Sequence, residues 1–94
     1  MGKAVATVMI DNERVRVTEW RFGPGDATGW HRHEHDYVVV PLTTGRLRLV
    51  GDDAAEPVTA ELEGGKAYFR KAGVEHDVVN ANSFAFAFVE TELK

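Results

Sequence analysis

The chain has 94 residues and no cysteine, and its 11 basic and 15 acidic residues give a formal net charge of −4. This length leaves room for one domain, so we expect a single domain over residues 1–94. The composition excludes disulfides, thiolate metal sites and cysteine nucleophiles, and the scattered charges argue against a nucleic-acid partner.

The apolar N-terminal segment is interrupted at Asp11 and Asn12, which makes it too short for a secretory signal. No apolar stretch in the chain approaches the roughly 20 residues that cross a bilayer as a helix. We therefore expect a cytoplasmic protein without a membrane partner.

Alternation of apolar and polar residues predicts half-buried strands along most of the chain. The pattern occurs at Val15 and Val17, at Leu47 and Leu49, and over residues 58–62. After Val17 the apolar residues change parity, because Trp20 and Phe22 occupy even positions. This change predicts a β-bulge, or a strand that crosses between sheets, between Glu13 and Phe22.

Turn-forming residues separate these segments at short intervals. They lie at residues 23–26, 43–45, 51–53, 63–65 and 71–73. No segment predicts a long helix. Many short strands joined by regular turns favour an all-β fold, a closed barrel or a sandwich, with little or no helix.

The last predicted strand is apolar on both faces. Its phenylalanines, Phe84, Phe86 and Phe88, share one parity, and Ala85, Ala87 and Val89 occupy the other. We expect this strand to be covered on both sides, with its phenylalanines in the core. In the alternative, one face packs against a second subunit.

Three histidines form the strongest candidate for a functional site. His31 and His33 point to the same side if their segment is extended, and His76 follows on a distant predicted strand. Neutral imidazole is a common ligand of iron, manganese, nickel, copper and zinc, and it suits calcium and magnesium poorly. The three residues therefore predict a site for one divalent transition metal ion, with coordination positions left for water or substrate; the alternative is a set of hydrogen-bonded interior histidines.

The spacing of histidines and glycines resembles the two sequence motifs of the cupin superfamily. The first motif is matched by Gly25, His31, His33 and Gly45, and the second by Gly65, Gly73, His76 and Asn80. The resemblance implies a small antiparallel jelly-roll β-barrel with the three histidines as metal ligands, and it favours a homodimer. Residues 30–45 also resemble a subgroup of small bacterial cupins that are often labelled as β-alanine degradation proteins.

Two positions depart from the cupin motifs. Lys71 replaces a proline, which should alter only a turn. The glutamate ligand of the first motif is missing, because Tyr37 and Val38 stand where it belongs. A fourth ligand could then be Tyr37, His35, Asp36 or no protein group. For Tyr37 we favour a role as hydrogen-bond donor to a bound ligand, with metal ligation and core packing as the alternatives.

We interpret the other large or charged side chains first as structural residues. We expect most of the aromatic residues Trp20, Phe22, Trp30, Tyr68 and Phe69 to pack in the core. The basic residues Arg21, Arg46 and Arg48 could reach a carboxylate, but alternation favours the outer face for them.

Two functions fit these residues. The first is a metal-dependent enzyme, an oxygenase, isomerase or lyase acting on a small polar or carboxylated metabolite, with Tyr37 as a catalytic donor. Three-histidine enzymes that resemble cupins include thiol and diketone dioxygenases, which supports this choice by analogy. The second is a non-catalytic module that binds or senses a small molecule, in which the metal has a structural or ligand-capturing role.

Overall fold

The computed structural model describes residues 2–51 and 56–94, and within them the chain forms nine β-strands and no helix. No helix in these two ranges is therefore available to span a membrane. The expected turn at residues 51–53 lies mostly outside the described residues. The strands are β1 (Val5–Asp11), β2 (Val15–Phe22), β3 (His31–Arg32), β4 (Asp36–Pro41), β5 (Gly45–Gly51), β6 (Val58–Leu62), β7 (Tyr68–Arg70), β8 (Glu75–Asn80) and β9 (Phe86–Leu93).

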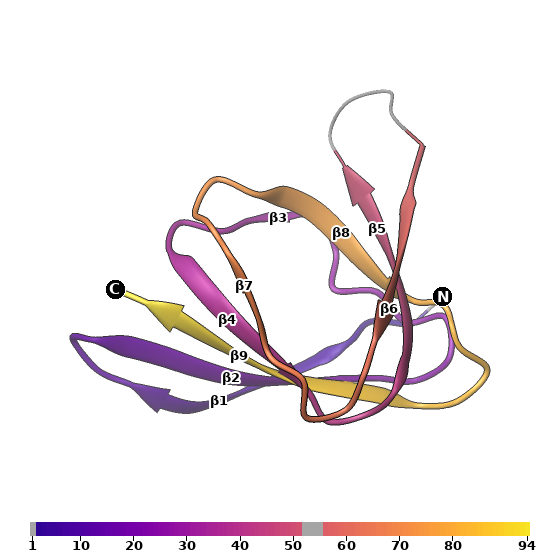
Figure 1. The fold of residues 1–94 in the computed structure, drawn as a ribbon, viewed down its shortest axis with the longest axis horizontal. Helices are drawn as coiled ribbons and strands as arrows, with labels where there is room; N and C mark the ends of the chain where they lie inside the picture. The colour runs from indigo at the N-terminus through magenta and orange to yellow at the C-terminus, as the bar shows by residue number, and fades with distance from the viewer. Residues whose placement is uncertain (1, 52–55) are drawn as a thin grey trace.

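The strands form two sheets that face each other (Figure 1). One sheet has the order β1-β2-β9-β4-β7 and the other the order β3-β8-β5-β6, and every pairing between named strands is antiparallel. Neighbours in a sheet are often distant in sequence, as where β9 lies between β2 and β4. The predicted all-β class and antiparallel jelly-roll architecture are confirmed.

The hydrophobic core lies between the two sheets. It is built mainly by inward-facing side chains of β2, β4, β5, β8 and β9, because alternate residues of a strand point to the same side. Its buried members are Ala4, Phe22, Tyr37, Val39, Leu47, Val78, Phe86 and Phe88.

The predicted bulge in the segment from Glu13 to Phe22 is wrong. β2 pairs with β9 without a register shift over its whole length. The irregularity lies in the neighbouring strand β1, between Val8 and Ile10. Thr18 and Phe22 are buried, so the even positions of β2 face the core and Val15 and Val17 occupy its other face.

The last strand is covered as expected over most of its length. Phe86, Ala87 and Phe88 are buried, whereas Phe84 precedes β9 and is exposed. The expectation for the other aromatic residues holds in part: Phe22 is buried and Trp20 and Tyr68 are partly buried, but Trp30 and Phe69 are exposed.

Asn80, at the end of β8, forms hydrogen bonds to the loops that follow β2 and β8. Its side-chain amide donates to the carbonyl oxygens of Gly23 at 3.0 Å and Phe84 at 2.9 Å, and its Oδ1 accepts from the backbone N–H of Asn82 at 3.0 Å. The turn at Gly73, which precedes β8, has a φ of 99°, a conformation that favours glycine. These contacts hold both ends of β8, the strand that carries His76.

Candidate metal centre

The three histidines are positioned by the pairing of β3 with β8. His31 lies opposite His76 in the register of this pair. The chain beyond β3 remains attached to the β8 side, since the His33 N–H donates to the Val74 carbonyl at 2.8 Å and its carbonyl accepts from Gly73 N–H at 2.8 Å. The short β3 segment and its continuation thus bring residues 43 positions apart in sequence side by side.

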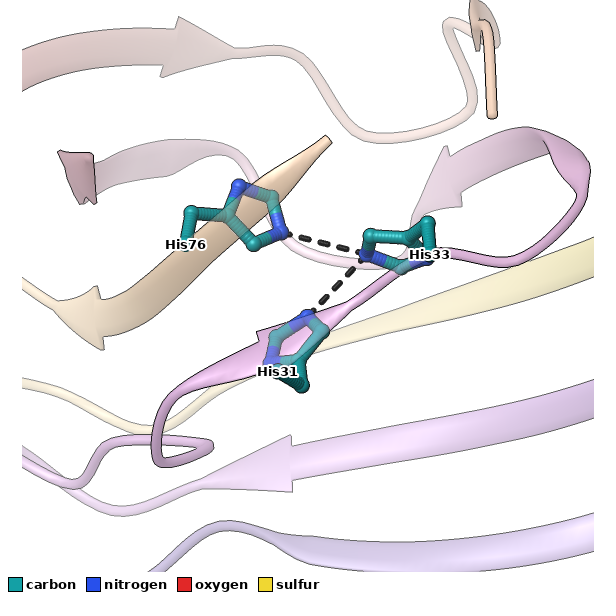
Figure 2. Close-up of side chains that lie close together, drawn as sticks. All are labelled: His31, His33 and His76. Atoms are coloured by element: carbon teal, nitrogen blue, oxygen red, sulfur yellow. Dashed lines mark hydrogen bonds between the residues drawn. The ribbon is translucent and has the colours of Figure 1, made fainter. Parts of the chain in front are cut away.

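The imidazole rings converge through their Nε2 atoms. The Nε2 atom of His33 lies 3.0 Å from that of His31 and 3.1 Å from that of His76. Figure 2 marks these two contacts with dashed lines. Among the described residues, these three form the group of histidine and acidic side chains whose ligand atoms lie close enough together to hold one ion. The predicted trio is therefore brought together by the fold.

A backbone carbonyl orients the ring of His31. Its Nδ1 atom lies 2.9 Å from the Gly29 carbonyl oxygen, so we assign the proton to Nδ1 as the donor. The Nε2 atom then carries a lone pair that points toward the other two rings. A carbonyl on the far nitrogen is the usual arrangement behind a metal-ligating histidine.

The imidazoles of His33 and His76 are held in the neutral form. Burial lowers the pKa of His33 to about 3, and repulsion from His31 and His76 acts in the same direction. Burial, followed by repulsion from His31, also lowers the pKa of His76 to about 4. Neutral imidazole is the form that binds metal, so ion binding near pH 7 would displace no proton from these two rings.

A cavity of about 130 Å³ adjoins the histidines. Apolar side chains from both sheets form most of its wall, including Val39, Leu47, Leu49, Leu62, Val78 and Phe88. Its polar lining includes the three histidines, Tyr37, Tyr68, Arg70 and Glu90. A mainly apolar cavity with a few polar groups at one site is typical of small-molecule binding.

Comparison with known proteins agrees with this fold. The cupin domain family matches residues 18–91, which is most of the chain. The chain belongs to the cupin domain family.

Two relatives match this cupin over nearly its whole length. It is 59% identical over 92 residues to the β-alanine degradation protein BauB of Pseudomonas aeruginosa, covering 98% of this chain and 95% of that protein. It is 56% identical to a cupin domain from Bordetella pertussis, whose crystal structure superposes with a TM-score of 0.94 and is covered to 95%, against 99% of this chain.

The fold is also shared with distant proteins. A cupin of Methanocaldococcus jannaschii with a double-stranded β-helix fold superposes with a TM-score of 0.78 at 17% identity, with 99% of this chain and 82% of that chain covered. This likeness concerns the architecture alone.

Tyr37 of this cupin lies beside the cluster, as its place in the sequence suggested. Its ring is buried and stacks on that of His33, with 3.9 Å between the ring centroids and 17° between the planes. Burial raises the pKa of Tyr37 to about 12, and the charge of Glu90 contributes in the same direction. The side chain is therefore a neutral phenol near pH 7, with a proton to donate.

The other candidates for a fourth ligand, His35 and Asp36, place no ligand atom within the histidine cluster. His35 and Asp36 do not line the cavity, and Asp36 Oδ1 instead accepts from the Ala72 N–H at 2.8 Å. The expectation for the basic residues is confirmed, because Arg21, Arg46 and Arg48 are exposed. Arg21 pairs with Glu19 at 2.8 Å and Arg46 with Glu61 at 3.5 Å.

Glu90 is a site residue that the sequence reasoning missed. It is buried on β9, and its Oε1 atom lies 4.0 Å from His33 Nε2. Burial raises the pKa of Glu90 to about 7; the charge of Glu92 raises it as well, while a hydrogen bond from the Trp20 side chain lowers it. The signal was available, since Glu90 continues the inward parity of Phe86 and Phe88. The carboxylate near these histidines thus comes from the last strand and not from the first motif.

Proposed function

We propose that this cupin is a metal-dependent enzyme acting on a small carboxylated metabolite, with His31, His33 and His76 holding one divalent transition metal ion. The observation that carries the proposal is the convergence of three imidazole Nε2 atoms on a cavity of small-molecule size. The name of the Pseudomonas aeruginosa relative supports a role in β-alanine degradation. We therefore place the substrate among the small carboxylates of that breakdown.

The donor set fits iron, manganese, nickel, copper or zinc. Three neutral nitrogen donors suit these ions better than calcium or magnesium, which prefer oxygen. A bound ion would supply Lewis-acid or redox chemistry at this end of the cavity. With three protein ligands, positions would remain for a substrate atom, as in catalytic sites generally.

Tyr37 and Glu90 are the groups that would handle protons. The phenol of Tyr37 can donate a hydrogen bond to an oxygen of the substrate, and its high pKa disfavours service as a phenolate ligand. Glu90 would accept a proton or a hydrogen bond at the histidine end. Both side chains are buried and line the mainly apolar cavity.

The first test is metal content. We expect protein purified without added metal, and then loaded, to bind up to one ion per chain. His76→Ala should weaken binding by more than about 100-fold, because it removes a ligand and not merely a supporting contact. His35→Ala is the matched control and should bind as the wild type does, since His35 lies outside the cluster. Isothermal titration measures the affinity and elemental analysis measures the number of ions per chain. A wild type that binds no ion under any metal-loading condition would refute the proposal.

The second test separates an enzyme from a binding module. Metal-loaded protein is incubated with β-alanine and other three-carbon carboxylates while oxygen consumption and product formation by NMR are followed. Turnover that His76→Ala abolishes would support the enzyme. Saturable binding without turnover would support the alternative, a sensing module with a ligand-capturing metal.

A further inference from the structure

The cavity contains one basic side chain among the described residues that line it, Arg70 of β7. Arg70 lies opposite Tyr37 in the register of β7 with β4, and its Cζ atom is 4.6 Å from the centroid of the Tyr68 ring. Its Nη1 donates to the Phe69 carbonyl at 2.9 Å. Stacking and this hydrogen bond hold the guanidinium in place and leave its other N–H groups available to a ligand.

Arg70 is exposed to solvent and also lines the cavity, and it differs from two other exposed arginines in its pairing. Arg21 and Arg46 each have a carboxylate partner, whereas no carboxylate of the described chain lies within 4.0 Å of the Arg70 guanidinium. A cation that borders a largely apolar cavity without an acidic partner attracts an anionic ligand. A guanidinium also matches a carboxylate geometrically, through two parallel hydrogen bonds.

The two charges of the cavity lie on different strands. Glu90 is on β9, beside His33, and Arg70 is on β7, with β4 between them. Two strand spacings separate the backbones by about 10 Å. A ligand carboxylate is repelled by Glu90 and attracted by Arg70, so it should lie at the β7 side with the rest of the molecule toward the histidines.

The remaining polar groups at the β7 side are the hydroxyls of Tyr37 and Tyr68, which both line the cavity and can donate hydrogen bonds. Burial raises the pKa of Tyr68, so that hydroxyl keeps its proton. The hydroxyls and the guanidinium together call for acceptor atoms on the ligand. In size, a cavity of about 150 Å³ accommodates a benzene-sized molecule of six heavy atoms, and this one is about 130 Å³.

We propose that Arg70 is the specificity-determining anion anchor of this cavity, binding the carboxylate of a ligand of about six heavy atoms whose other end faces His31, His33 and His76. The inference rests on the proposed function, because it names the substrate class of the same site. It does not require the metal to bind the carboxylate.

The test compares an acid with its neutral amide, using 3-hydroxypropionate and 3-hydroxypropionamide as probes. Binding is measured by isothermal titration on metal-loaded and metal-free protein. A charge-assisted contact of roughly 1.5–3 kcal/mol corresponds to about 10- to 150-fold in affinity. We therefore expect the wild type to prefer the acid by at least tenfold, and Arg70→Gln to abolish that preference. Arg70→Lys should retain part of the preference for the acid, because lysine keeps the charge but cannot form the two parallel hydrogen bonds of a guanidinium.

Arg46→Gln is the control, since it removes an exposed arginine that does not line the cavity. It should bind both probes as the wild type does. Equal acid affinity in wild type and Arg70→Gln, or no preference for the acid in the wild type, would overturn the anchor. Metal stoichiometry, measured on the same samples, tests the metal centre separately. If the protein binds one ion per chain and Arg70→Gln leaves the preference for the acid unchanged, the anchor alone is refuted. If the wild type prefers the acid but binds no ion, the metal centre alone is refuted.

Discussion

At the scale of single residues, the candidate site contains a buried acid beside its histidines. Glu90 is 7% exposed, and Glu92 two positions along β9 adds a like charge. Burial disfavours the ionised form, which raises the pKa of Glu90 from 4.5 to about 7. In metal-free protein this acid therefore holds its proton to a higher pH when folded than when unfolded.

The consequence is a loss of stability as pH rises. Between the unfolded pKa of 4.5 and the folded pKa of about 7 the folded state binds more protons, so the free energy of unfolding contributed by Glu90 falls across this window. The shift corresponds to about 3 kcal/mol. We predict that metal-free Glu90→Gln gains stability relative to the wild type between pH 5 and pH 8, by up to this amount.

Urea unfolding at the two pH values measures the difference, and Glu61→Gln, an exposed change on β6, serves as the control. Glu61 lies 3.5 Å from Arg46, so its ionised form already has a partner. If the stabilities of wild type and Glu90→Gln change in parallel with pH, Glu90 does not titrate as the structure indicates. A bound cation near Glu90 should reduce the effect, because it favours the carboxylate.

The two residues that sequence reasoning passed over, Glu90 and Arg70, share a cause. Charged residues lie mostly on protein surfaces, so neither was considered as a site residue. The inward parity of Glu90 was readable, because it follows Phe86 and Phe88. Arg70 shares the parity of Tyr68, but it is exposed and only borders the cavity. The three histidines were expected to converge because metal binding gives inward histidines a chemical reason, and their ligand atoms do lie together.

At the scale of elements, the alternation of apolar residues predicted the antiparallel strands but not which face of β2 is inward. Val15 and Val17 suggested odd positions, and burial of Thr18 and Phe22 shows even ones. Two valines on an outer face are compatible with strand propensity, since β-branched residues favour strands on either face. Which face of β2 is buried depends on where the opposite sheet packs, and that sheet is built from segments distant in sequence.

Asn80 shows how one side chain stabilises an element end. It is 2% exposed and satisfies two loop carbonyls with one amide. Truncation would leave these groups without a partner, at a cost of about 1–3 kcal/mol for each buried group. We predict that Asn80→Ala lowers the free energy of unfolding by about 2–4 kcal/mol, measured by urea denaturation. Ser83→Ala, an exposed change in the following loop, should alter it by less than about 0.5 kcal/mol.

At the scale of the whole molecule, β1 is a strand whose apolar side chains the fold of one chain leaves exposed. All seven of its residues are exposed, although Val5, Val8, Met9 and Ile10 are apolar and remain between 49% and 62% accessible. β1 also forms an edge of its sheet, with β2 as its neighbour. An apolar edge strand is a surface on which further chains pair, and soluble proteins rarely leave one uncovered.

A second copy of the chain is the occupant that this surface favours. Two copies of β1 can pair about a two-fold axis, which satisfies both edges at once and closes the assembly. We therefore predict a homodimer with twice the 10.4 kDa mass of the chain, measured by sedimentation velocity. Val8→Lys and Ile10→Lys should each shift the protein toward monomer, because each buries a charge without a partner. Lys66→Ala, far from β1 in the sequence and exposed, should leave the mass unchanged. A wild type that sediments as a 10.4 kDa species at tens of micromolar would show that β1 is tolerated in water as it stands.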